Sequence, residues 1–258
     1  MRAVFLCAGY GTRLYPLTKD KPKALLTIAG EPLLNHLIRK VEAVALIERV
    51  ILVTNERFAS HFSDWSRSLK TKLKVSVLND HTTAPENRLG AIRDLKLALD
   101  QDQKEEDVLV VASDNLFDAD LASFISFARS KAPACSVGVF DVQDRVLAKK
   151  YGLIKMDSSG KIMDFFEKPA EPPTTLASMG VYYFSRESLA HLDEYLKTNQ
   201  NPDAPGYYMA WLSKRTPLYA FQFSGTWFDI GDLDSYEKAD RYFTHIHESE
   251  GQQRRRNA

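Results

Sequence analysis

Short apolar runs alternate with segments of helical spacing through residues 1–140. The apolar runs lie at 3–7, 49–54, 73–78, 107–112 and 134–140. In the intervals between them, apolar residues recur every three or four positions, as they do on one face of a helix. This alternation predicts an α/β fold, namely a doubly wound, mostly parallel sheet with helices on both faces. In such a sheet, ligands bind at the carboxyl ends of the strands.

The second half of the chain has a different pattern, because most of its strand-like runs are joined by short links. These runs lie at 152–156, 162–166, 177–184 and 218–223, and helical segments lie at 185–197 and 207–214. We expect a mixed-sheet extension of the first sheet that carries one side of the ligand site.

The end of the chain is polar. A last helix is predicted over about 232–247, and the arginine-rich stretch after it lacks apolar residues that could anchor it. We therefore expect one domain over residues 1–248 and a disordered tail over 249–258.

Charge and cysteine content narrow the classes of function. Lysine plus arginine and aspartate plus glutamate both number 34, so the formal net charge is zero and general attraction to nucleic acid is not expected. Cys7 and Cys135 lie in apolar runs and suit core positions better than a disulfide framework. No signal peptide and no apolar stretch of the ~20 residues that cross a bilayer is visible. We expect a cytoplasmic protein that binds neither nucleic acid nor membranes. Its oligomeric state stays open, a homo-oligomer included.

A glycine-rich loop follows the first predicted strand, with the sequence Ala-Gly-Tyr-Gly-Thr-Arg-Leu at 8–14. Glycines let backbone N–H groups approach a phosphate closely, and Arg13 and Lys23 add positive charge beside them. The loop therefore predicts a phosphate-binding site.

The same loop also begins like a dinucleotide fingerprint, with glycines at 9 and 11. However, Leu14 stands where the third glycine belongs, and the run at 49–54 is not followed by an acid placed to bind a ribose. These mismatches disfavour a nicotinamide-dinucleotide site.

A longer string identifies a family. Gly-x-Gly-Thr-Arg-Leu-x-Pro-Leu-Thr at 9–18, with Pro-Lys-x-Leu-Leu at 22–26, resembles the signature of the sugar-nucleotide pyrophosphorylases, of which glucose-1-phosphate thymidylyltransferase is the best-known member. Tyr10 stands where a glycine is commoner in this family. The resemblance implies catalytic roles for Arg13 and Lys23. It also implies a nucleotide-binding set, Ala8, Gly9, Gly11, Thr12, Arg13, Lys23 and Gly90. The family often carries a C-terminal β-helix, for which this chain has no room.

Two aspartates are candidate metal ligands. Asp114 directly follows a buried apolar run, where a carboxylate can hold a hard divalent cation or cap a nearby helix. The resemblance favours the metal, because the family has a magnesium-binding aspartate in the same Asp-Asn pair. Asp229 lies in Trp-Phe-Asp at 227–229, which resembles the family's Trp-x-Asp-x-Gly element and implies the second Mg²⁺ ligand. We assign helix capping to Asp120 or Asp118, and to Asp232.

The acceptor side of the site is predicted from the resemblance as well. Glu-Lys-Pro at 167–169 resembles the family's acceptor element, in which the glutamate binds sugar hydroxyls and the lysine binds the sugar phosphate. The implied acceptor-binding set is Gly152, Glu167, Lys168 and Tyr182. Met179 stands where the family commonly has threonine or asparagine, which leaves open a different sugar or an acceptor that is not a sugar.

The reaction implied is that of a nucleotidyltransferase. An NTP and a sugar 1-phosphate give an NDP-sugar and pyrophosphate, with Mg²⁺ as cofactor and an already anionic nucleophile that needs no general base. The alternative on the same scaffold is a phosphocholine, or other alcohol-phosphate, cytidylyltransferase. A third class is a non-catalytic nucleotide-binding subunit. Such a subunit would not need all five of the chemically active side chains, so their presence together argues against it; they are Arg13, Lys23, Asp114, Lys168 and Asp229.

Overall fold

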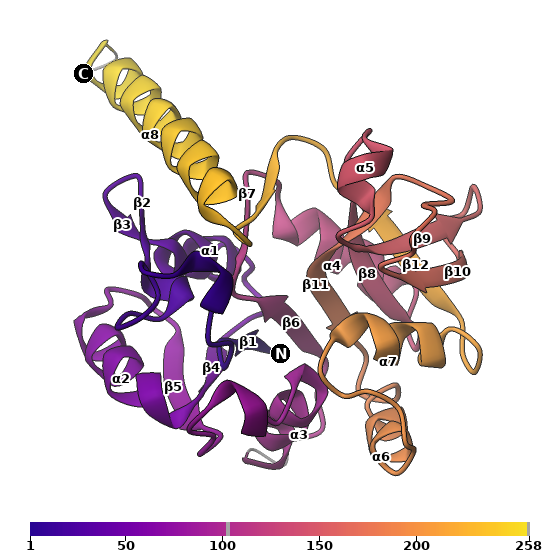
Figure 1. The fold of residues 1–258 in the computed structure, drawn as a ribbon. Coiled ribbons are helices and arrows are strands. Elements are labelled where there is room, and N and C mark those ends of the chain that lie inside the picture. Colours follow the sequence, from indigo (N-terminus) through magenta and orange to yellow (C-terminus); the bar gives the residue numbers. More distant parts are fainter. Residues whose placement is uncertain (102–103, 257–258) are drawn as a thin grey trace.

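The structure is a computed structural model that describes residues 1–101 and 104–256. A nine-stranded sheet forms its centre, with a main strand order of β10-β9-β11-β6-β1-β4-β5 (Figure 1). The strands of this sheet are β1 (Arg2–Leu6), β4 (Arg49–Thr54), β5 (Lys74–Asn79), β6 (Val108–Ala112), β8 (Cys135–Asp141), β9 (Gly152–Met156), β10 (Ile162–Glu167), β11 (Leu176–Phe184) and β12 (Leu218–Gln222). β1 pairs in parallel with β4 and β6, and β4 pairs in parallel with β5. The parallel half therefore matches the predicted α/β alternation.

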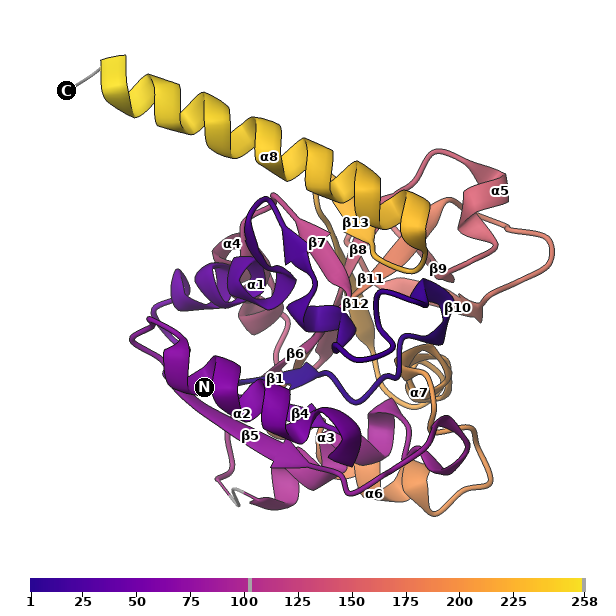
Figure 2. The same cartoon turned by 60° about the vertical axis from the view of Figure 1, so that its left-hand side comes forward.

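Helices cover both faces of this sheet (Figure 1, Figure 2). The α-helices of the described residues are α1 (Leu33–Glu42), α2 (Ala59–Ser68), α3 (Ala91–Gln101), α4 (Leu121–Ser130), α5 (Arg145–Ala148), α6 (Ala190–Leu196), α7 (Pro205–Leu212) and α8 (Leu233–Arg256).

Two apolar clusters lie on opposite faces of the sheet, because successive side chains of a strand point to opposite faces. In β1, Ala3 and Phe5 belong to one cluster with residues of α1, α2 and α4, whereas Val4 belongs to the other with residues of α3, α6 and α7. This two-sided burial explains why the central parallel strands β1, β4 and β6 are largely apolar, whereas the edge strand β5 also contains Lys74 and Ser76. Cys7 and Cys135 are buried, free thiols, as expected of core residues. Among the described residues, no helix has the combined length and apolar character needed to cross a bilayer.

The second half of the chain extends the sheet with mixed pairing, as predicted. β11 runs antiparallel to both β6 and β8, and β12 is parallel to β8. β9 and β10 form an antiparallel pair at the end of the sheet, beside α7. Two pairs of very short strands were not predicted, β2 (Thr27–Ile28) with β3 (Glu31–Pro32) and β7 (Asn115–Phe117) with β13 (Trp227–Asp229).

The last helix, α8, is longer than predicted. Its first half packs on the core through Ala239 and Phe243, and Asp240 accepts a 2.7 Å hydrogen bond from the N–H of Ala29. The helix then projects away from the domain as far as Arg256 (Figure 2). The predicted helix end near 247 is therefore too early, since the glutamate, glutamine and arginine residues that follow are good helix formers. Residues 257–258 of the predicted tail lie outside the described part, and within that part no β-helix follows β13.

Candidate active site

The glycine-rich loop lies at the carboxyl end of β1 and lines a cavity of about 330 Å³, which we call the donor cavity. Gly11 has a φ of +63°, a left-handed conformation that favours glycine, and its carbonyl accepts a 2.7 Å hydrogen bond from Thr18 Oγ1. A Cβ added at Gly9 would meet no atom within 4 Å, so this backbone is open to a ligand. All seven residues of the predicted nucleotide set line the cavity, namely Ala8, Gly9, Gly11, Thr12, Arg13, Lys23 and Gly90.

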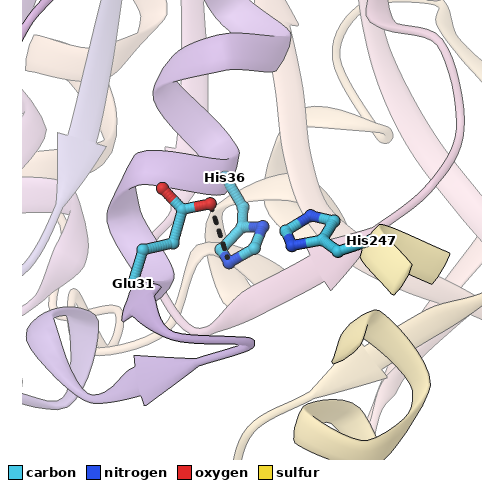
Figure 3. A group of neighbouring side chains, drawn as sticks. All are labelled: Glu31, His36 and His247. Carbon is cyan, nitrogen blue, oxygen red and sulfur yellow. Dashed lines mark ion pairs between the residues drawn. The ribbon is translucent and has the colours of Figure 1, made fainter. Parts of the chain in front are cut away.

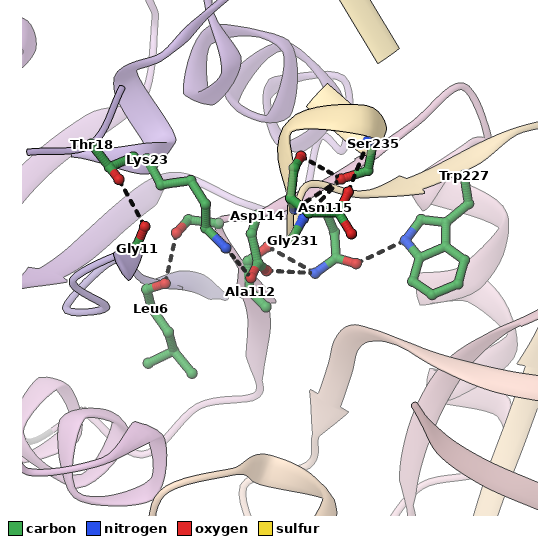
Figure 4. A network of polar contacts seen from close by, with 12 residues as sticks. Leu6, Gly11, Thr18, Lys23, Ala112, Asp114, Asn115, Trp227, Gly231 and Ser235 are labelled. Carbon is green, nitrogen blue, oxygen red and sulfur yellow. Dashed lines mark hydrogen bonds and ion pairs between the residues drawn. The ribbon is translucent and has the colours of Figure 1, made fainter. Parts of the chain in front are cut away.

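Lys23 links this loop to the strand end that carries Asp114. Its Nζ lies 2.7 Å from Oδ2 of Asp114 (Figure 4). Asp114 sits between β6 and β7, where the first parallel strands end, and both side chains are mostly buried. Burial alone would raise the pKa of Asp114, but the adjacent ammonium of Lys23 and the guanidinium of Arg13 hold it below its usual range.

The unpredicted ribbon of β7 and β13 brings Asp229 to the same place. Asp229 pairs in register with Asn115, and the N–H of Ile230 donates a 2.8 Å hydrogen bond to the carbonyl of Asp114. The side chain of Asn115 continues this network, because its Nδ2 donates to Oδ1 of Asp114 and its Oδ1 accepts from Trp227 Nε1 (Figure 4). The two predicted metal ligands, 115 positions apart in sequence (229 − 114), thus lie on neighbouring strand ends.

The two carboxylates influence each other. Burial, followed by the charge of Asp114, raises the pKa of Asp229 to about 6. The pKa values of the two acids are therefore shifted in opposite directions. Such a split is expected when two carboxyl groups lie in one cleft and the positive charges nearby are too few to stabilise both as anions. Oxygen ligands from two carboxylates suit a hard cation such as Mg²⁺, and a cation placed between them would remove the repulsion.

A second cavity, of about 460 Å³, lies on the other side of Asp114, and we call it the acceptor cavity. The predicted acceptor residues Gly152, Glu167, Lys168 and Tyr182 all line it, together with Asp229. Arg13, Ala112, Asp114, Pro205 and Gly231 line both cavities. The donor and acceptor sides therefore meet at Arg13 and Asp114.

Glu167 lies deep in the acceptor cavity with only 9% of its side chain exposed. Burial raises its pKa, while Lys168, whose Nζ is 3.9 Å away, counteracts this. Two glycines leave room for the carboxylate. A Cβ at Gly152 would lie 3.0 Å from Oε2 of Glu167, and one at Gly206 would lie only 1.7 Å from it. Lys168 itself is exposed, and its N–H donates to the carbonyl of Tyr151.

The segment 202–206 joins the two cavities. Near the donor side, Asp203 pairs through both carboxylate oxygens with Arg88, at 2.6 and 2.8 Å. Gly90, with a φ of +89°, packs so closely on this segment that a Cβ there would lie 2.8 Å from the Cα of Asp203. At its other end, Gly206 packs against Glu167 in the acceptor cavity.

Met179 does not belong to the acceptor cavity, which corrects the expectation drawn from it. Its side chain is 1% exposed and lies in the core, whereas the neighbouring Ser178 and Gly180 line the cavity. Adjacent residues of a strand point to opposite faces, so the apolar side chain at 179 removes no polar group from the site.

The aspartates assigned to capping do cap helices. Asp120 accepts from the N–H groups of Ala122 and Ser123 at the start of α4. Asp232 accepts from the N–H of Ser235 at the start of α8. Asp114 and Asp229 cap no helix, so these roles are separate.

A different group of metal-ligand residue types lies beside α1, namely Glu31, His36 and His247 (Figure 3). His36 already uses both ring nitrogens, since Nε2 lies 2.9 Å from the carbonyl of Ile28 and Nδ1 lies 3.1 Å from a nitrogen of Arg39. Arg39 also holds both oxygens of Glu31. Glu31 and His36 are therefore engaged in a hydrogen-bond network with Arg39, and the ring of His247 stacks on that of His36 with centroids 5.5 Å apart.

Several donor-cavity residues were not predicted, notably Arg88, Asp94 and Asp203. Arg88 and Asp203 carry no local motif. Asp94 could have been noticed in the sequence, because it is an acid on the apolar face of α3 that contains Ile92, Leu95 and Ala98.

Comparison with known proteins agrees with this geometry. The profile of the family described as "Nucleotidyl transferase" matches residues 2–245. A UTP–glucose-1-phosphate uridylyltransferase, AglF of Haloferax volcanii, is 30% identical over 187 residues, which are 72% of this chain and 72% of that protein. A mannose-1-phosphate guanylyltransferase catalytic subunit beta of Drosophila pseudoobscura pseudoobscura is 30% identical over 89% of this chain and 59% of its own length.

Other relatives extend well beyond the matched region. The bifunctional protein GlmU of Methanococcus vannielii is 27% identical over 94% of this chain but only 55% of its own length, so this chain spans about half of that relative. Among solved structures, a putative glucose-1-phosphate thymidylyltransferase of Bacillus anthracis superposes with a TM-score of 0.79 at 23% identity, covering 95% of both chains, and so shares the fold. The profile match and the shared fold lead to one conclusion: the chain belongs to the nucleotidyl transferase family.

Proposed function

We propose that this protein joins a nucleoside triphosphate and a sugar 1-phosphate to give a nucleoside diphosphate sugar and pyrophosphate, and that it requires Mg²⁺. The observation that carries the proposal is the meeting of two cavities at Arg13 and Asp114, one beside a glycine-rich loop and one beside Glu167 and Lys168. Relatives named for uridylyl and guanylyl transfer to sugar 1-phosphates support this choice of substrates.

In the proposed reaction, a phosphate oxygen of the acceptor attacks the α-phosphorus of the NTP. A new P–O bond forms, the bond to the β-phosphate oxygen breaks, and pyrophosphate leaves with the electron pair. The nucleophile is already anionic, so no side chain needs to remove a proton. The protein instead positions two anions against their repulsion and neutralises the charge that develops. Arg13 and Lys23 do this on the donor side, and Lys168 holds the acceptor phosphate.

Glu167 gives the acceptor cavity its selectivity in this proposal. Its carboxylate is buried, and its closest charged neighbour is Lys168 at 3.9 Å. A buried carboxylate that accepts hydrogen bonds suits a ligand with several hydroxyl groups, such as a sugar. A quaternary ammonium such as choline would meet this carboxylate through charge alone, without a hydrogen bond. Met179, the residue that left an alcohol phosphate open as the acceptor, lies in the core.

Asp114 and Asp229 would hold the Mg²⁺. Their partly buried side chains line the same cavity and their pKa values are shifted in opposite directions, which fits a site that prefers a cation between them. The ion would offset phosphate charge during the transfer.

The test is pyrophosphate release, with Mg²⁺, across five NTPs and a panel of sugar 1-phosphates, with choline phosphate as a separate acceptor. Release with at least one sugar 1-phosphate supports the proposal, and the Lys23→Ala variant serves as a matched control for contaminating activity. Release with choline phosphate alone would favour the alcohol-phosphate alternative. No release with any pair would overturn the proposal.

A further inference from the structure

The donor cavity contains a buried acid that the proposed reaction does not use. Asp94 lies in the first turn of α3, lines the cavity, and is 5% exposed. Its Oδ1 is buried and accepts from no N–H or O–H group of the described residues, while its carboxyl group is hydrogen-bonded to that of Asp80. A carboxyl group has more acceptor sites than one hydrogen bond uses, so Asp94 can accept a further hydrogen bond from a ligand in the cavity that it lines.

The other acids of this cavity are already paired. Asp114 is bound to Lys23, and Asp203 is bound through both oxygens to Arg88. Among the described residues that line the donor cavity, Asp94 is the acid for which no cation is within ion-pair distance. It is therefore the acid free to interact with a neutral ligand group.

Asp80 lies behind Asp94 and explains how the acid is tolerated. Oδ1 of Asp80 accepts from both the N–H and the Oγ1 of Thr82, at 2.7 Å each, while its Oδ2 is buried without a donor. Burial, then the charge of Asp80 and a hydrogen bond between the two carboxyl groups, raises the pKa of Asp94 to about 8. At neutral pH Asp94 therefore carries a proton, which it can donate in the hydrogen bond to Asp80.

Tyr10 connects this acid pair to the glycine-rich loop. Its hydroxyl donates to Thr82 Oγ1 at 3.3 Å, and Thr82 in turn donates to Asp80. Tyr10 is 5% exposed and does not line the donor cavity. The tyrosine that stands where the family commonly has a glycine thus anchors the loop to the network that holds Asp94.

We propose that Asp94 is a specificity-determining residue for the nucleobase, which accepts a hydrogen bond from a ring N–H and so favours guanine, thymine or uracil over cytosine and adenine. With its proton committed to Asp80, Asp94 offers only oxygen lone pairs to the cavity. Guanine, thymine and uracil carry an N–H on the ring edge used for pairing, whereas cytosine and adenine carry a ring nitrogen lone pair there, which would repel the oxygen. This inference rests on the proposed function, because it assumes that an NTP places its base in the donor cavity beside Gly90.

The test is direct binding of each NTP by calorimetry with Mg²⁺ and no acceptor, in the wild type and in three variants. Asp94→Asn retains the carbonyl oxygen and donates an N–H to Asp80, so it mimics the protonated acid. Asp94→Leu removes the acceptor at similar volume. Glu86→Gln neutralises an exposed acid on the preceding loop and controls for net charge.

We expect the wild type, Asp94→Asn and Glu86→Gln to bind the favoured NTPs about tenfold more tightly than CTP and ATP. We expect Asp94→Leu to lose this difference through weaker binding of the favoured NTPs, with CTP and ATP unchanged. If the order of bases in folded Asp94→Leu equals that of the wild type, or if the wild type prefers CTP or ATP, the inference is overturned while the proposed function stands. If no NTP binds to the wild type, both are overturned.

A second measurement decides the matter if Asp94→Leu does not fold. The affinity of the wild type for its favoured NTP should fall as the pH rises from about 7 to about 9, because Asp94 then loses its proton and repels the phosphates. Asp80, Asp203 and Cys7 are the other titratable groups that face Asp94, and they are the same in Asp94→Asn. That variant should show no such fall. Equal pH profiles in the two proteins would overturn the inference.

Discussion

Replacing Gly206 with alanine tests how the acceptor cavity holds Glu167. A Cβ at position 206 would lie 1.7 Å from Oε2 of Glu167 and 2.7 Å from its Cδ, so the carboxylate cannot keep its position. These atoms are at the far end of a flexible side chain, which can rotate away without moving the backbone. We therefore expect the domain to fold normally and the carboxylate to leave its place beside Gly152.

The size of the effect follows from the contact that is lost. A hydrogen bond to a charged group contributes about 1.5–3 kcal/mol, so loss of the bond from an acceptor hydroxyl to Glu167 should lower kcat/KM for the sugar phosphate about 10- to 100-fold. Affinity for the NTP should change little, because Gly206 does not line the donor cavity. Alanine is a better helix former than glycine by about 0.5–1 kcal/mol, so the melting temperature should not fall by more than a few degrees.

The assay is steady-state pyrophosphate release by four proteins, the wild type, Gly206→Ala, Glu167→Ala and the double variant. If Gly206→Ala acts only by displacing Glu167, the double variant will have the acceptor kcat/KM of Glu167→Ala. The reasoning is refuted if Gly206→Ala keeps the wild-type value, or if the two losses multiply in the double variant.

Four further predictions follow from the site. Lys23→Ala should lower turnover about a hundredfold, because a charge contact that strengthens in the transition state contributes roughly 3 kcal/mol; unchanged turnover would make Lys23 a structural partner of Asp114 only. Lys168→Ala should raise KM for the sugar phosphate and leave NTP binding by calorimetry intact, and a collapse of NTP affinity would place this lysine on the donor side. Asp114→Asn and Asp229→Asn should each abolish Mg²⁺-dependent pyrophosphate release, and the double variant should be no worse than either, whereas wild-type activity in EDTA would contradict a shared ion. Finally, the unfolded chain releases the proton of Asp94 above about pH 4, whereas the folded protein keeps it up to about pH 8. The free energy of unfolding of the wild type should therefore fall between about pH 4 and about pH 8 relative to that of Asp94→Asn. Melting temperatures of the two proteins that change in parallel across this range would argue against the raised pKa.

The parallel half of the fold and the closeness of the glycine loop to Asp114 were predictable because both follow from one rule. Buried parallel strands are continuous apolar runs, and their carboxyl ends lie at one edge of the sheet. The glycine loop after β1 and Asp114 after β6 therefore had to lie close together, and β1 and β6 are indeed direct neighbours. The placing of Asp229 depended on family resemblance alone, because β7 and β13 have three residues each and leave no readable periodicity.

The remaining differences have local causes. The pairing of β11 is irregular between Ser178 and Tyr182. The resemblance to the family's motif therefore did not show which face of the sheet the side chain of Met179 lies on. The role proposed for Asp94 depends on its hydrogen bond with Asp80. Asp80 precedes Asp94 by only a loop and the start of α3, but the sequence does not show that the two side chains meet. The end of α8 was missed because helix propensity continued after the apolar pattern stopped.

The segment 202–206 gives the two cavities a shared wall, so a displacement of this segment on one side changes the space on the other. The bond between Arg88 and Asp203 fixes one end of the segment, and the contact between Gly206 and Glu167 fixes the other. If the proposed substrates occupy these cavities, an NTP that moves Asp203 should alter the space available to the acceptor, and by reciprocity a bound acceptor should change NTP affinity by the same factor. A substitution in the donor cavity that displaces this segment should therefore change the affinity for the acceptor, even where no atom of the acceptor is touched.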